Sequence, residues 1–315
     1  MQQKIEAWLR QNKYHSNINL SFKNAVIGYK SIGYTVSFLF FLLTTFSIIW
    51  SSCMSKFVMN DKQIADYFAT SAQKPTYHTY EVNGRKMHYA AIGNDTLPMV
   101  LFVHGSPGAW YAFISFLRDS NLYDKARIVA VDRPGFGKSD DGKVVISVQE
   151  QAALIKPILE TNKSKKMPLL VGHSYGGPVI GRLAMDYPSL VGELLIVAGS
   201  IDPDLEDNKW YRYVGKSFLV RALLPKALDV SNREIIPLRE QLQLMLPLWK
   251  NIKIPVTVLQ GEQDDLVPPM NAAFAKKMLG DTTILKIIMI PNMNHFIPWR
   301  RPDLITDAIK RYLNK

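Results

Sequence analysis

Cysteine is nearly absent from this sequence, since Cys53 is the only one among 315 residues. A single thiol cannot form an intramolecular disulfide, so the apolar core has to hold the fold without covalent help. The scarcity of cysteine says little about the redox compartment, because exported proteins need not contain disulfides. The sequence also lacks histidine and cysteine clusters with zinc-ligand spacing, a Walker sequence and a dinucleotide-binding glycine pattern. We therefore expect no metal and no cofactor.

Runs of five or more basic residues are missing as well, although the formal net charge is +11. The densest basic patch contains only Lys163, Lys165 and Lys166. Charge spread in this way is typical of a solvated surface, so we expect no nucleic acid partner and at most weak attraction to anionic lipid headgroups. A hydrophobic content of 47% excludes a disordered chain, and the length allows one large catalytic domain with a small additional segment.

Charge is absent altogether from one stretch of the N-terminal region, between Lys30 and Lys56. About 20 mostly apolar residues are enough to span a bilayer as a helix, and amphipathic rings such as those of Tyr34 and Trp50 prefer its interfaces. The stretch therefore predicts a transmembrane helix over residues 31–55, which anchors the chain in a lipid bilayer. A buried core helix is the alternative, but a core helix of this length normally carries a polar stripe.

The basic residues that flank this stretch predict its orientation. Lysine and arginine are more numerous before it than just after it, so residues 1–30 are expected in the cytoplasm. The catalytic domain would then lie in the periplasm, at a bacterial inner membrane, after a linker over residues 56–75. Two alternatives remain: a cleaved signal peptide, or a lipoprotein in which Cys53, at the end of Trp50-Ser51-Ser52-Cys53, carries the lipid. Both also place the catalytic domain outside the cytoplasm.

From residue 76 onward, short apolar runs alternate with stretches of helical spacing. Asn83-Gly84, between two alternating segments, is the strongest short hairpin signal. The pattern predicts a mostly parallel sheet of eight strands with helices on both faces, in a catalytic domain over residues 76–315. Ligands bind such sheets at the carboxyl ends of the strands. The expected strands are 76–82, 85–92, 99–103, 127–131, 167–172, 194–198, 256–260 and 284–290, with helices over 148–159, 178–187 and 302–313.

Residues 200–252 interrupt the alternation with helical spacing and many large apolar side chains. They lie between two strands that should be neighbours, which predicts a small helical cap over the site. An apolar cap favours a substrate with an apolar acyl or alcohol group, although the same side chains serve equally well for packing onto the core. The large apolar residues include Trp210, Tyr211, Tyr213, Phe218, Leu219, Leu223, Leu224, Leu246 and Trp249.

The strongest chemical signal is the sequence Gly172-His173-Ser174-Tyr175-Gly176. It matches G-x-S-x-G between an expected strand and an expected helix. This is the context of a nucleophile at a sharp turn, which we call the elbow. Side chains two residues either side of the serine would clash in such a turn, so it requires glycine at Gly172 and Gly176. We expect Ser174 to be the nucleophile. The helix that follows favours negative charge developing beside it.

A serine hydroxyl needs a base, and His295 is the best candidate because it closely follows the last expected strand. The base in turn needs a carboxylate to hold its tautomer. Asp264 gives the chain order serine, acid, histidine; Asp265 is the alternative acid and Asp202 a third option. The other histidines fit worse. His15 precedes the apolar stretch, and His78 and His88 lie in the early hairpin. His104 directly follows the expected strand 99–103, and His173 lies next to Ser174 within the elbow.

The oxyanion that forms during acyl transfer needs two backbone donors. The amide of Tyr175, next to the nucleophile, is the first, and the amide of Ser106, in the turn after strand 99–103, is the expected second. Pro107 has no N–H and cannot serve. Each such oxyanion-hole donor contributes about 3–4 kcal/mol of transition-state stabilisation.

Four signatures, taken in order, make residues 77–313 resemble the α/β-hydrolase superfamily. In that family the Gly-x-x-Asp pattern places the triad acid on the aspartate that matches Asp264. Asp132 and Arg133 match a structural turn, so the resemblance gives them no catalytic role. The signatures are His104-Gly105-Ser106-Pro107-Gly108, then Asp132-Arg133-Pro134-Gly135-Phe136-Gly137-Lys138-Ser139, then the elbow, then Gly261-x-x-Asp264-x-x-Val267-Pro268 with Asn294-His295-Phe296.

The superfamily includes esterases, lipases, peptidases, dehalogenases, epoxide hydrolases and carbon–carbon hydrolases, and likeness of fold alone cannot choose among them. Its dehalogenases and epoxide hydrolases carry aspartate at the nucleophile position, where this chain has Ser174. The segment 104–107 with Trp110 nevertheless resembles theirs, and it is also similar to the one in proline iminopeptidases.

The leading hypothesis is a carboxylesterase-like serine hydrolase whose small-molecule substrate is an ester, with an apolar group that the apolar cap favours. A peptidase or amidase of proline-iminopeptidase-like type is the alternative, and it would use an acidic group of the cap to bind the substrate amine. A non-catalytic membrane scaffold on the same fold is the third hypothesis, and the oligomeric state is left open. The acidic residues available in the cap are Glu206, Asp207, Glu234 and Glu240.

Overall fold

The computed structural model describes Ser37, Phe41 and residues 59–207, 212–213, 215, 217–280 and 285–315. The chain divides into two units, Met1–Val58 and Met59–Lys315. The transmembrane helix predicted over residues 31–55, and with it Cys53, lies outside the described residues except for Ser37 and Phe41. Of the helices that are described, none has both the length and the apolar character needed to cross a membrane.

An eight-stranded sheet forms the centre of the second unit, in the order β1-β2-β4-β3-β5-β6-β7-β8. The pairs β1–β2 and β2–β4 are antiparallel, and every other neighbouring pair is parallel. The predicted sheet, eight-stranded and mostly parallel, is therefore confirmed for the described part of the chain. Its strands are β1 (Thr76–Val82), β2 (Arg85–Ile92), β3 (Met99–Val103), β4 (Arg127–Asp132), β5 (Leu169–His173), β6 (Glu193–Val197), β7 (Val256–Gly261) and β8 (Leu285–Ile290).

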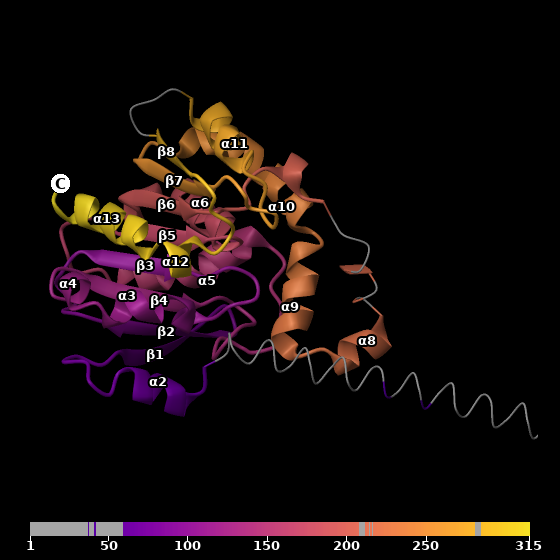
Figure 1. Cartoon of the computed structure of the whole chain (residues 1–315), viewed down its shortest axis with the longest axis horizontal. Coiled ribbons are helices and arrows are strands. Elements are labelled where there is room, and N and C mark those ends of the chain that lie inside the picture. Colours follow the sequence, from indigo (N-terminus) through magenta and orange to yellow (C-terminus); the bar gives the residue numbers. More distant parts are fainter. Residues whose placement is uncertain are drawn as a thin grey trace, which may run out of the picture. The chain divides into compact units, whose positions relative to one another are not determined.

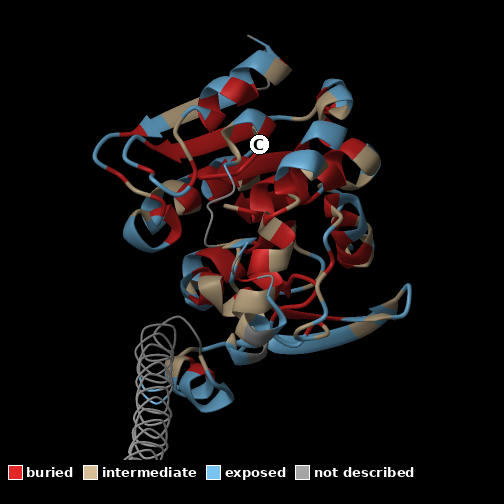
Figure 2. Ribbon diagram, turned by 90° about the vertical axis from the view of Figure 1, so that its right-hand side faces the viewer, coloured by how far each residue is buried: buried red, intermediate tan, exposed pale blue. Residues whose placement is uncertain are grey.

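Each face of the sheet carries its own apolar core, because successive side chains of a strand point to opposite faces. In β3, for example, Leu101 belongs to one core and Phe102 to the other. Figure 1 shows helices on both sides of the sheet, and Figure 2 shows buried residues concentrated between the two layers. The first core includes side chains of α5 (Val148–Glu160), α6 (Gly176–Asp186) and α11 (Asn271–Leu279); the second includes those of α2 (Asp61–Tyr67), η1 (Trp110–Phe113), α3 (Ile114–Arg118), α4 (Ser120–Tyr123), α12 (Ile297–Arg300) and α13 (Pro302–Leu313).

Four parallel strands deliver the expected site residues to one edge of the sheet. The turn 104–108 follows β3, Ser174 follows β5, Asp264 follows β7, and His295 follows β8. Because β3, β5, β7 and β8 run in the same direction, their carboxyl ends meet at a single rim.

The insertion between β6 and β7 is helical, as predicted for the cap over residues 200–252. Its large apolar side chains divide into two groups. Trp249 is buried in the first core, whereas Tyr213, Phe218 and Leu223 are exposed. Trp210 and Tyr211 lie outside the described residues. The elements of the insertion are η3 (Pro203–Leu205), α8 (Phe218–Leu223), α9 (Lys226–Ile235), α10 (Leu238–Met245) and η4 (Leu246–Asn251).

The stretch expected as a linker, residues 56–75, includes the helix α2. Asn60 begins this helix with a capping box, in which its side chain accepts from the Gln63 amide while the Gln63 side chain accepts from the Asn60 amide. Ile64 and Phe68 insert into the second core. The folded unit that contains the sheet therefore begins before the first strand, because these two side chains bury apolar surface that a free linker would expose.

Candidate active site

Ser174 occupies the sharp turn between β5 and α6 with a φ of 54°. This left-handed backbone is uncommon for a residue with a side chain, and it persists only where the surroundings fix it. A Cβ added at Gly172 would lie 2.4 Å from the Gly176 carbonyl oxygen, and one added at Gly176 would lie 2.2 Å from the Val103 carbonyl oxygen. Neither position has room for a side chain, so the glycines predicted from the elbow pattern are required by backbone contacts.

The turn is anchored by the neighbouring strand and approached closely by the turn after β3. The amide of Ser174 donates to the Val197 carbonyl oxygen at 3.0 Å. A Cβ added at Gly105 would lie 2.8 Å from the Ser174 Cβ atom. Glycine at this position therefore lets the segment that includes Ser106 lie directly against the serine.

His295 and Asp264 form a buried pair at the same rim. The distance from His295 Nδ1 to Asp264 Oδ2 is 2.8 Å, and the side chains are 8% and 0% exposed. Nδ1 carries the proton in this pairing, because the carboxylate oxygen can only accept. The Nε2 atom of His295 is then the unprotonated nitrogen, which is the one that can act as a base.

The Asp264 carboxylate is held by several donors besides the histidine. Its Oδ1 atom accepts from the amides of Leu266 at 3.0 Å and Val267 at 2.8 Å, and its Oδ2 atom accepts from Gln260 at 3.3 Å. The alternative acid, Asp265, is exposed to solvent. Three of the donors to Asp264 are fixed in place by the backbone or the core, so the carboxylate is set in one orientation toward His295.

The third candidate acid, Asp202, has a different role in the structure. Its side chain accepts from the amide of Asp204 at 2.9 Å and begins the short helix η3. This is the ordinary behaviour of an aspartate at a helix N-terminus.

His173 connects the elbow to the loop of His295. Its Nε2 atom donates to the His295 carbonyl oxygen at 3.1 Å, and the two rings lie 4.7 Å apart. Burial, reinforced by the neighbouring His295, lowers the pKa of His173 to about 3, so this ring stays neutral at physiological pH. Among the described residues, no hydrogen bond joins Ser174 to His295 directly. Such bonds are often long in enzymes without substrate and tighten in the complex.

The turn after β3 is arranged around His104. The amide of Arg133 donates to His104 Nε2 at 2.9 Å, which makes Nε2 an acceptor and leaves the proton on Nδ1. Nδ1 then donates to the Gly105 carbonyl oxygen at 2.7 Å. Burial lowers the pKa of His104 well below its usual range, in keeping with this neutral tautomer. In the described part of the chain, the buried hydroxyl of Ser106 finds no hydrogen-bond partner.

Of the other histidines, His88 belongs to the support of the neighbouring turn. Its Nδ1 atom lies 2.7 Å from Asp132 Oδ2, and Asp132 also accepts from the amides of Trp110 and Lys138 at 2.8 and 2.9 Å. His78 is exposed on β1, and His15 lies outside the described residues. The resemblance to a structural turn is therefore consistent with how Asp132 is bonded.

The acidic residues that the sequence offers in the cap differ in accessibility. Glu234 is fully buried in an ion pair with Arg133, so it is not available to a substrate amine. Glu240 is exposed on α10. Glu206 is largely enclosed and accepts from the Ser200 hydroxyl, while the Ser200 amide donates to the Ser174 carbonyl oxygen at 3.3 Å. Burial raises the pKa of the Glu206 carboxyl, and the charge of Arg212 opposes this shift.

The loops that carry Asp264 and His295 also expose large apolar side chains. Leu266 and Met270, in the loop after β7, are 67% and 60% exposed. Phe296 and Trp299, after β8, are 36% and 48% exposed, with ring centroids 5.9 Å apart. We call these four residues the apolar rim. Exposed apolar side chains gathered beside a polar site are typical of contact with an apolar ligand or surface.

Within the described ranges, no three histidine, cysteine, aspartate or glutamate side chains gather in a way that could hold a metal ion.

Comparisons with known proteins agree with this arrangement. A model of the "Alpha/beta hydrolase family" matches residues 100–308. Epoxide hydrolase 1 of Caenorhabditis elegans is 23% identical over 281 residues, which cover 73% of this chain and 68% of that protein. Proline iminopeptidase PfmaB of Pestalotiopsis fici is 23% identical over 279 residues, which cover 75% of this chain and 98% of that protein.

Among solved structures, a membrane phospholipase A described as a bacterial virulence factor matches with a TM-score of 0.60 and 18% identity. The match covers 93% of this chain and 98% of that chain. At this identity the likeness shows the fold alone.

Two residues that lie near the site are not predicted from the sequence to have a role there. From the sequence alone, His173 is only a variable position of the elbow, and Arg133 is only part of a turn. No local pattern predicts that His173 bonds to a residue 122 positions away, or that Arg133 pairs with one 101 positions away.

Gly176 and Gly181 of α6 provide a direct test of the elbow packing. Gly176→Ala places a methyl group 2.2 Å from a backbone oxygen, so we expect it to lower the free energy of unfolding by about 1–3 kcal/mol. Gly181→Ala is the matched control, because the nearest atom is 3.7 Å away and belongs to the flexible Met245 side chain. It should raise stability by about 0.5–1 kcal/mol through helix propensity. Urea unfolding measures both, and equal effects of the two variants would contradict the packing described here.

Proposed function

Because this chain belongs to the α/β-hydrolase family, we propose that it is a serine hydrolase that cleaves a carboxylic ester through an acyl-enzyme intermediate. Ser174 attacks the ester carbonyl while His295 Nε2 takes its proton. His295 then returns that proton to the leaving alkoxide, and water releases the acyl group by the reverse sequence. Asp264 keeps the His295 proton on Nδ1 and stabilises the imidazolium that forms.

The observation that carries this proposal is the buried pair of His295 and Asp264, at 2.8 Å, beside a serine held at a left-handed elbow. Either feature alone has structural explanations. Together, at the carboxyl edge of a parallel sheet and in the chain order serine, acid, histidine, they supply a nucleophile, its base and the group that orients the base.

The identity of the nucleophile argues against epoxide hydrolysis, despite the likeness to an epoxide hydrolase. A carboxylate that opens an epoxide forms an ester, whose carbonyl carbon water can attack. Ser174 would instead form an ether, which has no carbonyl and could not be released at the same site. Serine therefore favours acyl substrates, in which the covalent intermediate is itself an ester.

Two backbone amides are proposed to stabilise the tetrahedral intermediate. Tyr175 begins helix α6, so its amide lies where the helix dipole favours negative charge. The amide of Ser106 is the second donor, brought against the elbow by the close approach of Gly105.

The apolar rim supports an ester with an apolar acyl or alcohol group. Its four side chains lie on the loops that carry the proposed acid and base, so an apolar substrate approaching the site would cover them. Burial of apolar surface contributes about 25 cal/mol per Å², which favours such a substrate over a polar one of the same shape.

We further propose that the chain is held at a membrane by the apolar stretch 31–55, with the catalytic domain outside the cytoplasm. Support comes from the absence of charge between Lys30 and Lys56 and from the excess of basic residues before it.

A peptidase is the second candidate, and Glu206 is the observation that favours it. Its enclosed carboxylate lies next to Ser200, which is bonded to the Ser174 backbone, and a buried carboxylate is suited to a substrate amine. The likeness to a proline iminopeptidase supports this direction. Arg212 already faces this carboxyl, and its positive charge would compete with that of an amine, so ester hydrolysis is favoured.

The triad is tested by activity-based labelling of the full chain with a fluorophosphonate. We expect wild type to be labelled and Ser174→Ala to be unlabelled. Asp264→Asn should lower kcat toward a p-nitrophenyl ester by about 10⁴-fold, because the imidazole loses its oriented tautomer. Asp265→Asn is the matched control, and its exposed side chain predicts near wild-type turnover. If wild type remained unlabelled, the chain would instead be a non-catalytic scaffold on this fold.

Ester and amide specificity are separated by a panel of p-nitrophenyl esters and aminoacyl p-nitroanilides. The leading proposal predicts turnover of esters of medium acyl length and none of the anilides. A peptidase would cleave the anilides, and Glu206→Gln would then lower their kcat/KM by about 10–100-fold, the value of one charge-assisted hydrogen bond. Glu240→Gln, which changes an exposed carboxylate of the same insertion, is the control for either result.

Membrane attachment is tested by alkaline carbonate extraction of bacterial membranes that contain the full chain. Wild type should stay in the pellet. Replacing Leu42 and Leu43 by arginine should release the protein, because each change opposes insertion by about 3 kcal/mol. Leu244→Arg, at a 63% exposed position of α10, is the control and should remain attached. Extraction of the wild-type chain would contradict the anchor.

A further inference from the structure

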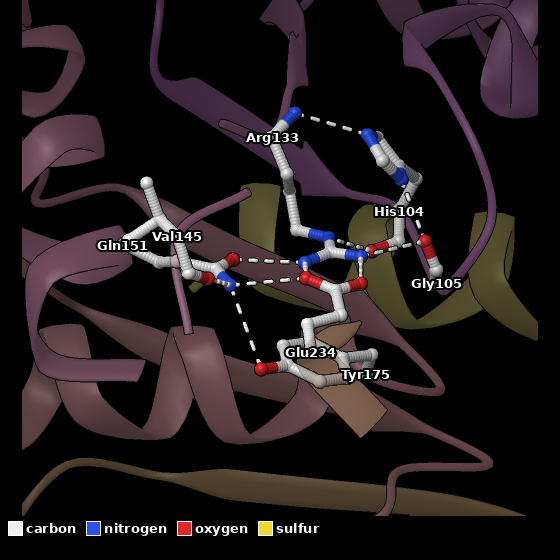
Figure 3. A network of polar contacts seen from close by, with 7 residues as sticks. All are labelled: His104, Gly105, Arg133, Val145, Gln151, Tyr175 and Glu234. Atoms are coloured by element: carbon white, nitrogen blue, oxygen red, sulfur yellow. Dashed lines mark hydrogen bonds and ion pairs between the residues drawn. The ribbon is translucent and has the colours of Figure 1, made fainter. Parts of the chain in front are cut away.

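Arg133 lies at the end of β4 in an ion pair that is completely buried. Its Nη2 atom donates to Glu234 Oε1 at 2.7 Å and its Nη1 atom to Oε2 at 2.9 Å, with both side chains 0% exposed. Figure 3 shows the guanidinium and the carboxylate meeting end to end within a larger network of polar contacts. Glu234 belongs to helix α9 of the cap, whereas Arg133 directly follows strand β4 of the sheet. The pair therefore joins the cap to the catalytic core.

All five N–H groups of this guanidinium are engaged. Besides the two bonds to Glu234, Nη1 donates to Gln151 at 2.8 Å, Nε to the His104 carbonyl oxygen at 2.9 Å, and Nη2 to the Gly105 carbonyl oxygen at 3.0 Å. A guanidinium has five donors, so none remains for a substrate. Its role must therefore lie in the groups that it already holds.

Gln151 closes the network on the other side. Its amide nitrogen donates to Glu234 Oε2 at 3.1 Å and to the Val145 carbonyl oxygen at 2.8 Å, and it lies 3.5 Å from the hydroxyl of Tyr175. The Tyr175 ring faces the guanidinium, with its centroid 4.4 Å from the Arg133 Cζ atom. The network thus touches both residues that flank the proposed oxyanion site, through the Tyr175 side chain and through the turn after β3.

The bond from Arg133 to Gly105 has a chemical consequence for Ser106. The carbonyl of Gly105 and the amide of Ser106 belong to one peptide group, and in a trans peptide they point in opposite directions. Two donors, Arg133 Nη2 and His104 Nδ1, bind the carbonyl side at 3.0 and 2.7 Å. They fix the plane of the peptide and polarise it, which makes the opposite N–H a stronger donor.

We propose that Arg133 is a positioning residue of the oxyanion hole, which orients and polarises the Gly105–Ser106 peptide, and that Glu234 of the cap holds it in that role. This inference rests on the proposed serine hydrolase function and adds how the second oxyanion donor is prepared. Glu234 neutralises the guanidinium, so the effect reaches the oxyanion through the peptide and not as an uncompensated buried charge. Seating of the cap and stabilisation of the transition state are thereby linked.

The test separates this role from simple support of the fold. Arg133→Met with Glu234→Met removes both charges together, and such apolar replacements of buried ion pairs often keep or raise stability. We expect the double variant to fold and to hydrolyse p-nitrophenyl esters with a kcat/KM lowered by about 10–100-fold. This is less than the loss on deleting an oxyanion donor, about 10²–10³-fold, because the Ser106 amide is still present.

The decisive readout is inhibition by a trifluoromethyl ketone, which adds to the serine and forms an oxyanion at the same place. Its inhibition constant should rise by the factor by which kcat/KM falls, because both quantities compare the oxyanion state with the free enzyme, whichever step limits kcat. Arg133→Lys keeps the positive charge beside Glu234 but loses the planar set of donors of the guanidinium, so its loss of kcat/KM should be smaller than that of the double variant. If the double variant does not fold, Arg133→Lys provides the same comparison of kcat/KM with inhibitor affinity.

The matched control removes an ion pair of α6 that does not touch the site. Arg182→Met with Asp186→Leu deletes a pair at 2.8 Å and should leave kcat/KM and inhibitor affinity within about twofold of wild type, as expected for independent sites. A folded Arg133 and Glu234 double variant with wild-type kcat/KM would overturn the inference, as would a loss of kcat/KM with unchanged inhibitor affinity or a loss confined to stability. If wild type showed no Ser174-dependent ester hydrolysis, the proposed function itself would fail; unchanged Arg133 variants of an active enzyme would contradict this inference alone.

Discussion

Close approach of backbone segments at one rim of the sheet is the constraint on which the site depends. The turn after β3 lies against Ser174 because Gly105 has no side chain, and the elbow closes because Gly172 and Gly176 have none. At the far side of the rim, a Cβ at Gly261 would lie 2.3 Å from the Met293 carbonyl oxygen, so glycine there lets the loop of His295 meet the loop of Asp264. The segments that carry the chemical groups are therefore brought together by close backbone packing.

Two buried hydrogen-bonded pairs complete the site on opposite sides of the serine. His295 and Asp264 lie 2.8 Å apart on the side of β7 and β8, and Arg133 meets Glu234 at 2.7 Å on the side of the cap. In the proposed mechanism, the first pair acts on the proton of the nucleophile, and the second acts on the peptide that receives the oxyanion. A buried pair that loses one partner leaves an uncompensated charge, at a cost of about 3–5 kcal/mol, so both pairs also fix the loops that carry them.

Much of the fold and the candidate residues of the site could be predicted from the sequence, because the patterns that indicate them are local. The strand and helix pattern, the elbow around Ser174 and the Gly-x-x-Asp pattern at Asp264 each occupy a few consecutive residues. What could not be predicted depends on distant partners: Glu234 was a candidate for binding a substrate amine, and only the fold brings Arg133 to it across 101 positions. The sequence predicts a linker where the structure has helix α2. This helix is short and buries only Ile64, and it is stabilised by a core formed by residues far along the chain, so its local pattern is weak.

The central claim is that Ser174 carries the acyl group during turnover. It is tested most directly by rapid quenching of the full chain with a p-nitrophenyl ester, followed by mass spectrometry of its proteolytic peptides. The account predicts a burst of p-nitrophenol equal to the enzyme concentration, and an acyl group on the peptide that contains Ser174. A steady release with no burst and no adduct, or an acyl group on another residue, would contradict it.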